Sequence, residues 1–207
     1  MAKSLTEDTI ARKLHRAYKP NTIASTDGYA EMYANVDLTC AAVLVPLVCK
    51  EDGWHLLFTR RTDSVYHHKG QVSFPGGACD KGESTPEETA LREANEEIGL
   101  KPERVRVLGR LNATITITHY RVTPVVGILP WPYSFRPAPR EVGRVFTIPL
   151  QWLSNCENWE ERNATPKGVP RSFPVIIYHP YDGEILWGAT ARMTQDFLRV
   201  LGMLKNK

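Results

Sequence analysis

The chain has 207 residues, of which 42% are hydrophobic and 24% are charged, a composition typical of a globular domain with a substantial core. The formal charge of +3 is small and no run of Lys or Arg is dense, so we predict no nucleic-acid partner. The longest uncharged apolar run, from Ala41 to Cys49, is far shorter than the roughly 20 residues that span a bilayer, so we predict no membrane partner. The N-terminal segment is charged throughout and lacks the apolar stretch of a secretory signal, which predicts a cytoplasmic protein.

The four cysteines give no sign of a metal site or of a covalent framework. They are Cys40, Cys49, Cys79 and Cys156, and they show no CxxC spacing and lie mostly in apolar segments. We therefore predict neither a zinc site nor disulfides, and we interpret the cysteines as buried or incidental thiols.

The N-terminal region predicts one helix. Ser4 followed by Glu7 has the spacing of a capping box, and apolar residues then recur at helical spacing until Pro20 ends the run. The residues after Pro20 are polar and aperiodic. We expect residues 1–38 to form an N-terminal helix and linker, and residues 39–207 to form the main domain.

Apolar runs bounded by turn residues predict strands along much of the remaining chain. They lie at residues 39–49, 54–60, 71–74, 104–116, 121–129, 142–148 and 172–178. The last stretch, 189–204, has apolar residues at helical spacing and predicts a closing helix. Strands mixed with a few helices, without regular alternation, favour the α+β class over a doubly wound sheet.

A central helix is predicted by signals at both of its ends. Thr85 is placed to be the N-cap, with Pro86 at the first helical position and Glu88 at the third. Gly99 is placed to end the helix in the left-handed conformation. One apolar stripe runs along the helix and consists of Ala90, Leu91, Ala94 and Ile98.

Glu93, Glu96 and Glu97 share a face near the C-terminal end of this helix. Carboxylates there oppose the helix dipole at a cost of roughly 0.3–1 kcal/mol each, and they repel one another. One interpretation is a solvated face on which Arg92 pairs with Glu88 and Glu96, one turn away on either side. The other starts from the Gly-Gly loop before the helix, whose backbone can bend sharply toward a ligand. A hard cation such as Mg²⁺, bound by the carboxylates, would then offset their charge.

The same stretch resembles the Nudix box: a Gly, a Glu after five residues, then Arg-Glu-apolar-x-Glu-Glu-x-Gly-apolar. Here these are Gly77, Glu83 and "REANEEIGL" from Arg92 to Leu100. Eight residues, instead of the usual seven, separate Glu83 from Arg92. The preceding segment, "LLFTRRTDSVYHHKGQVSFPGG" (56–77), resembles the coenzyme A pyrophosphatase branch of the Nudix hydrolases, a branch that tends to carry the extra residue.

The resemblance implies a Nudix-type α/β/α sandwich with a mixed central sheet. It also implies a Mg²⁺- or Mn²⁺-dependent enzyme, often a homodimer, with an anionic diphosphate-containing small molecule as substrate. Our leading hypothesis is a pyrophosphatase that cleaves coenzyme A or its derivatives to 3′,5′-ADP and 4′-phosphopantetheine. Tyr66 stands where the branch usually has Arg, which leaves ADP-ribose, a nucleotide sugar or a dinucleotide open as alternative substrates. A noncatalytic nucleotide sensor is a third hypothesis.

The resemblance also implies roles for individual residues. Those placed at the metal are Gly77, through its carbonyl, and Glu93, Glu96 and Glu97. Glu96 is a third ligand or a base. Arg92 is expected to orient the carboxylates, because it lies to one side of the helix face that they share. Glu141 is expected to be a metal ligand or general base, with a surface position beside Arg140 as the equal alternative.

Four cationic residues are candidates for contact with the phosphates of the substrate. They are Arg60, Arg61, His68 and Lys69, and exposed charges at the end of a hairpin are the competing interpretation. His67 and His68 are adjacent on an extended segment, so at most one of them points into the site. No third ligand is spaced to join them, so we predict no histidine metal site.

Overall fold

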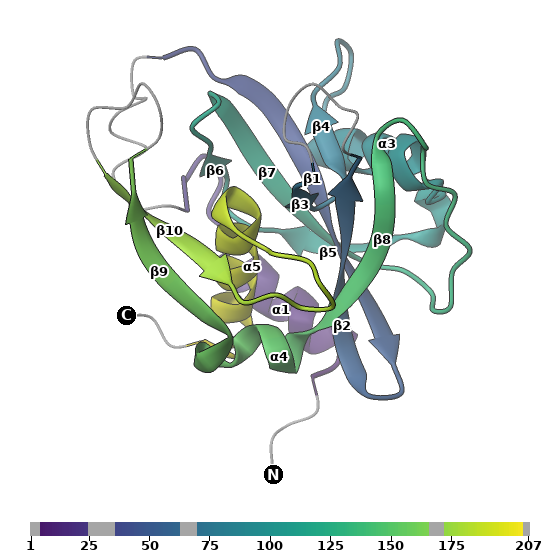
Figure 1. The fold of residues 1–207 in the computed structure, drawn as a ribbon. Helices are drawn as coiled ribbons and strands as arrows, with labels where there is room; N and C mark the ends of the chain where they lie inside the picture. The colour runs from purple at the N-terminus through teal and green to yellow at the C-terminus, as the bar shows by residue number, and fades with distance from the viewer. Residues whose placement is uncertain (1–4, 25–35, 63–69, 166–171, 205–207) are drawn as a thin grey trace.

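A computed structural model of the protein describes residues 5–24, 36–62, 70–165 and 172–204. Within these ranges the chain forms a mixed β-sheet between layers of helices (Figure 1). The helices are α1 (Glu7–Ala17), α3 (Pro86–Ile98), α4 (Leu150–Ser154) and α5 (Gly188–Leu201), with 3-10 turns at Pro102–Arg104 and Cys156–Asn158. The α+β class predicted from the sequence is confirmed.

Strand β1 (Thr39–Lys50) is the centre of the main sheet. The other strands of this sheet are β2 (Gly53–Arg61), β3 (Val72–Ser73), β4 (Gly76–Ala78), β5 (Arg106–Arg110), β6 (Thr114–Ile115), β7 (Tyr120–Ile128) and β8 (Val142–Pro149). Strand β1 pairs antiparallel with β2 and β4 and parallel with β7, which makes the sheet mixed. Strands β9 (Trp159–Ala164) and β10 (Phe173–Tyr178) form a separate antiparallel pair at the left of Figure 1.

The main sheet is buried on both faces. On one face, Val45 belongs to a core that includes Leu14 of α1 and Phe197 of α5. On the other face, Leu44 packs in a second core with Ala94 of α3. Figure 1 accordingly shows α3 at the right of the view, beside β4, and α1 and α5 together nearer its centre. The arrangement is an α/β/α sandwich, as expected.

Helix α3 has the boundaries predicted from its sequence. The Glu88 N–H donates to the Thr85 hydroxyl at 3.3 Å, and the Thr85 N–H donates to the Glu88 carboxylate at 3.1 Å, which together form a capping box. Gly99 ends the helix with φ of 66°, in the left-handed region that favours glycine. The predicted apolar stripe faces the sheet, with Ala90, Ala94 and Ile98 fully buried.

Helix α1 begins later than predicted. Its N-cap is Thr6, whose hydroxyl accepts the N–H of Thr9, and Glu7 is the first helical residue, so the predicted capping box from Ser4 to Glu7 is wrong. The helix packs on β5 and α5 and buries Ile10 completely. It therefore contributes to the same core as the main sheet. The domain boundary between residues 38 and 39 stays a prediction.

Three other predictions from the sequence were incomplete. The single strand predicted at residues 104–116 is divided into the end of a 3-10 turn (Pro102–Arg104), β5 and β6, and within β5 the pairing with β7 shifts register between Val107 and Gly109. Helix α4 was missed because it has only five residues. Strand β9 was missed because its sequence, WEERNA, is polar and mostly exposed, with no apolar alternation to mark it.

Cys40 and Cys79 form a disulfide, so the prediction of no disulfide is wrong. Strand β4 pairs antiparallel with β1 directly beside both cysteines and brings their Cα atoms to 5.4 Å. The sequence separation of 39 residues conceals this neighbourhood. Cys49 and Cys156 are free thiols, but they are exposed and not buried.

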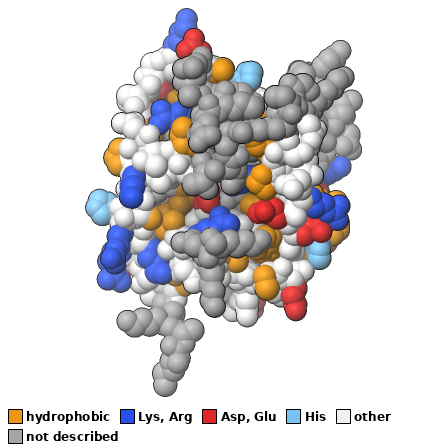
Figure 2. Space-filling model, turned by 90° about the vertical axis from the view of Figure 1, so that its left-hand side faces the viewer, with side chains coloured by type: hydrophobic (Ala, Val, Ile, Leu, Met, Phe, Trp, Pro, Cys, Tyr) orange, Lys and Arg blue, Asp and Glu red, His pale blue; other side chains and the backbone are white. Residues whose placement is uncertain are grey.

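None of the helices in the described ranges is long and apolar enough to cross a lipid bilayer. Figure 2 views the molecule from the side that is at the left of Figure 1, where β9 and β10 lie. On this face hydrophobic side chains occur in small groups among polar and charged ones. Helix α3 lies toward the other side of the molecule, at the right of Figure 1.

Replacing both Cys40 and Cys79 by Ala is expected to lower the free energy of unfolding by roughly 2–4 kcal/mol, because the bond restricts the unfolded chain over a separation of 39 residues. For a chain of this size the thermal midpoint should fall by on the order of 4–16 °C. The Cys49→Ala, Cys156→Ala double variant is the matched control and should melt like the wild type.

Thiol titration gives an independent measurement of the same bond. Without reductant the unfolded wild type should show two reactive thiols, those of Cys49 and Cys156, and four after reduction. Four reactive thiols before reduction would contradict the disulfide.

Candidate functional site

The residues of the Nudix-like motif come together where the C-terminal half of α3 meets β4. A Cβ atom at Gly77 would lie 2.5 Å from Oε1 of Glu93, so a larger residue there would displace this carboxylate. A Cβ atom at Gly76 would lie 2.4 Å from the carbonyl oxygen of Ala42 in β1. The two glycines therefore let β4 fit between α3 and the centre of the sheet.

Arg92 holds this cluster together. Its Nε donates to Glu83 at 2.7 Å, and its Nη1 donates to Glu93 at 2.9 Å and to Glu96 at 3.1 Å. Its Nη2 donates to the carbonyl oxygen of Ala78 in β4 at 3.0 Å. One guanidinium thus connects three carboxylates and the strand, an arrangement that agrees with the orienting role expected of it. Of the two ion pairs in the solvated-face interpretation, the one with Glu96 is present, whereas the Glu88 carboxylate caps the start of the helix instead.

Glu83 is the most strongly bonded acidic residue of the cluster. Besides Arg92, the Thr89 hydroxyl donates to it at 2.6 Å and the Asp80 N–H at 2.8 Å. Arg92 first, and Thr89 second, lower the pKa of Glu83 to about 2. The partnership of Glu83 with Arg92 is confirmed despite the extra residue between them. Thr89 is not among the residues predicted from the sequence, although it precedes Arg92 by three residues and so lies on the same side of the helix.

The three carboxylates near the end of α3 have different environments. Glu97 is 6% exposed and the Glu93 side chain 18%, whereas the Glu96 side chain is 59% exposed. Oε2 of Glu97 is buried and has no hydrogen-bond partner among the described residues. Burial first, and the charge of Glu93 second, raise the pKa of Glu97 to about 8, although Arg61 and the Gly76 N–H act in the opposite direction. Burial also raises the pKa of Glu93, against the opposing effect of Arg92.

The loop after β7 closes the C-terminal end of α3. The N–H groups of Arg136 and Ala138 donate to the carbonyl oxygens of Ile98 and Glu97 at 2.9 and 2.8 Å. The Tyr133 hydroxyl donates to the Gly99 carbonyl at 3.2 Å. These donors satisfy carbonyl groups that the helix itself leaves unpaired.

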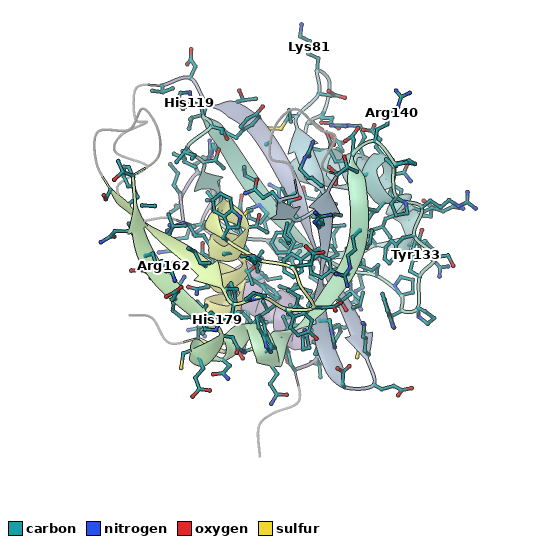
Figure 3. The ribbon with its side chains drawn as sticks, viewed as in Figure 1. Lys81, His119, Tyr133, Arg140, Arg162 and His179 are labelled. Carbon is teal, nitrogen blue, oxygen red and sulfur yellow. A yellow bond between two sulfur atoms is a disulfide. The ribbon has the colours of Figure 1, made fainter. Side chains whose placement is uncertain are left out.

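The same loop places Glu141 beside the buried carboxylates. The negative charge of Glu141 raises the pKa of both Glu93 and Glu97, so it lies within electrostatic reach of the two. Its backbone is held to the end of β2, because the Thr62 N–H donates to the Glu141 carbonyl at 2.9 Å. Figure 3 shows the neighbouring Arg140 pointing outward, away from the sheet.

The structure separates the cationic candidates. Arg61 affects the pKa of Glu97 and therefore lies near it, and its buried Nε has no hydrogen-bond partner among the described residues. Arg60, the preceding residue, instead lies beside Glu184, with its Nε 3.4 Å from that carboxylate. Two adjacent arginines thus have different surroundings. His68, Lys69 and Tyr66 lie outside the described residues.

The chemistry of this cluster fits a hard divalent cation. A buried carboxylate oxygen without a donor, next to two further carboxylates, is satisfied either by a proton or by a cation. In the described ranges, no three His, Cys, Asp or Glu side chains are already gathered at metal-binding distances. Arg92 instead holds the carboxylates of Glu93 and Glu96. Glu93 and Glu97, with the close approach of Gly77, are the residues that could hold the ion.

Glu97 should make the stability of the metal-free protein depend on pH. Because its pKa is raised from 4.5 to about 8 in the fold, the folded protein binds this proton more tightly than the unfolded chain does. The stabilisation is fully present below about pH 4.5 and is lost as the pH rises through about 8. With chelator present, the thermal midpoint of the wild type should therefore fall more between about pH 5 and 9 than that of Glu97→Gln.

The matched control for this measurement is Glu96→Gln, whose side chain is exposed and which should keep the pH dependence of the wild type. At the alkaline end Glu97→Gln should melt at or above the wild-type temperature. Identical pH profiles for wild type and Glu97→Gln would contradict the assignment.

Comparison with known proteins agrees with this geometry. The family model of the NUDIX domain matches residues 38–168. A protein of Photorhabdus laumondii subsp. laumondii named "Uncharacterized Nudix hydrolase NudL" is 36% identical over 151 residues, which are 73% of this chain and 79% of that protein. A protein of the same name from Yersinia enterocolitica is 38% identical over 151 residues, 73% of this chain and 75% of that protein.

Solved structures show the same fold. A Nudix hydrolase from M. smegmatis, RenU, superposes with a TM-score of 0.54 at 23% identity, covering 82% of this chain and 90% of that one. The MutT protein from Methanosarcina mazei Go1 gives 0.50 at 17% identity, covering 81% and 97%. The family match extends over more than half of the sequence and includes Gly77, Glu83 and the whole of α3. The chain therefore belongs to the Nudix family.

Proposed function

We propose that the protein is a metal-dependent hydrolase that cleaves the pyrophosphate bond of coenzyme A or its derivatives, giving 3′,5′-ADP and 4′-phosphopantetheine. The observation that carries the proposal is the pair of carboxylates of Glu93 and Glu97 at the end of α3. They lie beside the glycines of β4, and Arg92 forms an ion pair with Glu93. Relatives named Nudix hydrolase support the reaction class. The resemblance of residues 56–77 to the coenzyme A branch supports the substrate.

The residues near the end of α3 have separate proposed roles in metal binding and in positioning. Glu93, Glu97 and the carbonyl of Gly77 would hold Mg²⁺ or Mn²⁺, and Glu96 would be a third ligand or a base. The cation, when bound, would supply neutralisation of the charged pyrophosphate and a lower pKa for water. Arg92 acts as a positioning residue, because its guanidinium is occupied by carboxylates and by the Ala78 carbonyl.

The remaining candidates act from the strands around the carboxylates. Glu141 is proposed as a further ligand or general base, since its charge reaches both Glu93 and Glu97. Arg61 is proposed to contact a phosphate, because it lies near Glu97 and its Nε has no hydrogen-bond partner within the described ranges. Arg60 would first have to leave Glu184.

Other parts of the proposal come from the sequence. His68 and Lys69 are proposed to contact a phosphate, because they lie in the segment that precedes the Nudix box in the sequence. The cytoplasmic location and the homodimer also stay predictions. A noncatalytic nucleotide sensor is less well supported, since binding alone does not need the complete set of carboxylates.

The substrate can be tested by incubating the pure protein with coenzyme A and Mg²⁺ and separating the products by chromatography. We expect 3′,5′-ADP and 4′-phosphopantetheine to form in equal amounts, because one phosphoric anhydride bond is broken. ADP-ribose, a nucleotide sugar and a dinucleotide serve as parallel substrates. Turnover of one of these without cleavage of coenzyme A would reject the coenzyme A assignment, and no turnover of any would reject the hydrolase assignment.

The roles of the carboxylates can be tested by substitution. Glu97→Gln should lower kcat/KM by more than about 100-fold, because the variant loses a charged ligand, and Arg92→Lys should lower it about 10- to 100-fold through misplaced ligands. Glu103→Gln, on the exposed 3-10 turn, is the matched control and should keep wild-type turnover. Wild-type turnover by Glu97→Gln would refute its assignment.

A further inference from the structure

A second site lies at the opposite end of α3 from the carboxylates. It is a cavity of about 330 Å³ whose walls come from the segment after α1, from β1, β5 and β7, and from Pro86, the first residue of α3. Glu93 and Glu97 follow Pro86 by two to three helical turns, which is about 10–16 Å along the helix axis. The two sites are therefore separate.

The cavity has an excess of positive charge. Lys19, Arg110 and Arg121 line it, and none of the described residues that line it is an Asp or Glu. The guanidinium of Arg110 is neutralised by Glu87, with Nε–Oε1 and Nη2–Oε2 distances of 2.6 and 2.5 Å. Within the described ranges, the side chains of Lys19 and Arg121 have no carboxylate partner. Two positive charges are thus available to a ligand.

The positions of these residues are set by backbone hydrogen bonds. The Lys19 N–H donates to the side chain of Asn112 at 2.9 Å, and the Ala24 N–H donates to the Ala113 carbonyl at 2.7 Å. These bonds tie the segment after α1 to the chain between β5 and β6. The wall that carries Lys19 is consequently part of the folded structure.

Arg121 is placed by the pairing of β1 with β7. It lies opposite Cys40 in the parallel register, as Thr123 lies opposite Ala42, and Ala42 packs in the core on the α3 side of the sheet. Because side chains alternate along a strand, Arg121 and Thr123 both point to that side. Cys40, which forms the disulfide with Cys79, also lines the cavity.

We propose that this cavity binds a phosphate monoester of a small hydroxylated molecule, at a site distinct from the carboxylates. Lys19 and Arg121, which have no carboxylate partner among the described residues, match the double negative charge of a phosphate monoester, and a guanidinium matches its geometry. A volume near 330 Å³ is larger than a phosphate group needs and is in the range of small-ligand sites. Asn21 and Thr123 offer polar groups for hydroxyls, and Leu38 offers an apolar contact. The inference does not depend on which diphosphate the carboxylates cleave.

Titration calorimetry in metal-free buffer with chelator tests the proposal, with ribose 5-phosphate as the probe. The wild type should bind one equivalent, and inorganic phosphate should compete while ribose should not. Arg121→Gln should weaken binding by at least about 10-fold, the effect of losing a charge-assisted hydrogen bond. Arg104→Gln removes the same charge from an exposed position and should bind like the wild type.

Two further variants show where the ligand binds and provide a test that does not depend on the folding of Arg121→Gln. Glu97→Gln should leave the affinity unchanged, since the carboxylates lie elsewhere. Lys19→Gln, at an exposed position, should weaken binding whether or not Arg121→Gln folds, as judged by its thermal midpoint. Three results would each overturn the proposal. The first is no saturable binding of ribose 5-phosphate by the wild type, and the second is unchanged affinity in both Lys19→Gln and a folded Arg121→Gln. The third is loss of binding in Glu97→Gln.

Discussion

The arrangement of the candidate site depends on the contacts of one guanidinium. Arg92 joins Glu83, which precedes α3, to Glu93 and Glu96 of the helix and to the carbonyl of Ala78 in β4. Charge-assisted hydrogen bonds of this kind are stronger than neutral ones, and a planar guanidinium directs them along fixed lines. The same contacts explain how acidic residues are tolerated near a helix end. The positive charge lies among them, and the loop after β7 satisfies the last carbonyls of the helix.

Glu97 is the exception in this arrangement, because its environment opposes its charge. It is buried near the charges of Glu93 and Glu141, and one of its oxygens has no donor in the part of the chain that the structure describes. An unsatisfied buried acceptor of this kind costs roughly 1–3 kcal/mol. Functional sites often keep such an unfavourable buried group, because it must take up a proton or a cation during function. The burial of Glu97 thus connects the packing of α3 with the chemistry proposed for it.

Helix α3 also connects the two sites. Its C-terminal half carries the carboxylates, and its first residue borders the basic cavity. The Cys40–Cys79 disulfide lies between them, because Cys40 borders the cavity and Cys79 follows the β4 residue whose carbonyl accepts from Arg92. Burial of Ala90, Ala94 and Ile98 against the sheet holds the helix in place.

The sequence by itself determined whatever depends on neighbours along the chain. The capping box and the terminal glycine of α3, its apolar stripe, the shared face of the carboxylates and the α+β class all follow from spacings of a few residues. Only the tertiary structure decided which distant segments meet. It joined Cys40 to Cys79, gave Arg60 and Arg61 different surroundings, buried Glu97 while leaving Glu96 exposed, and brought Arg121 and Lys19 to the same cavity. The physical reason is that these outcomes depend on strand pairing and on the packing of α3 against the sheet, and neither is encoded in a local pattern.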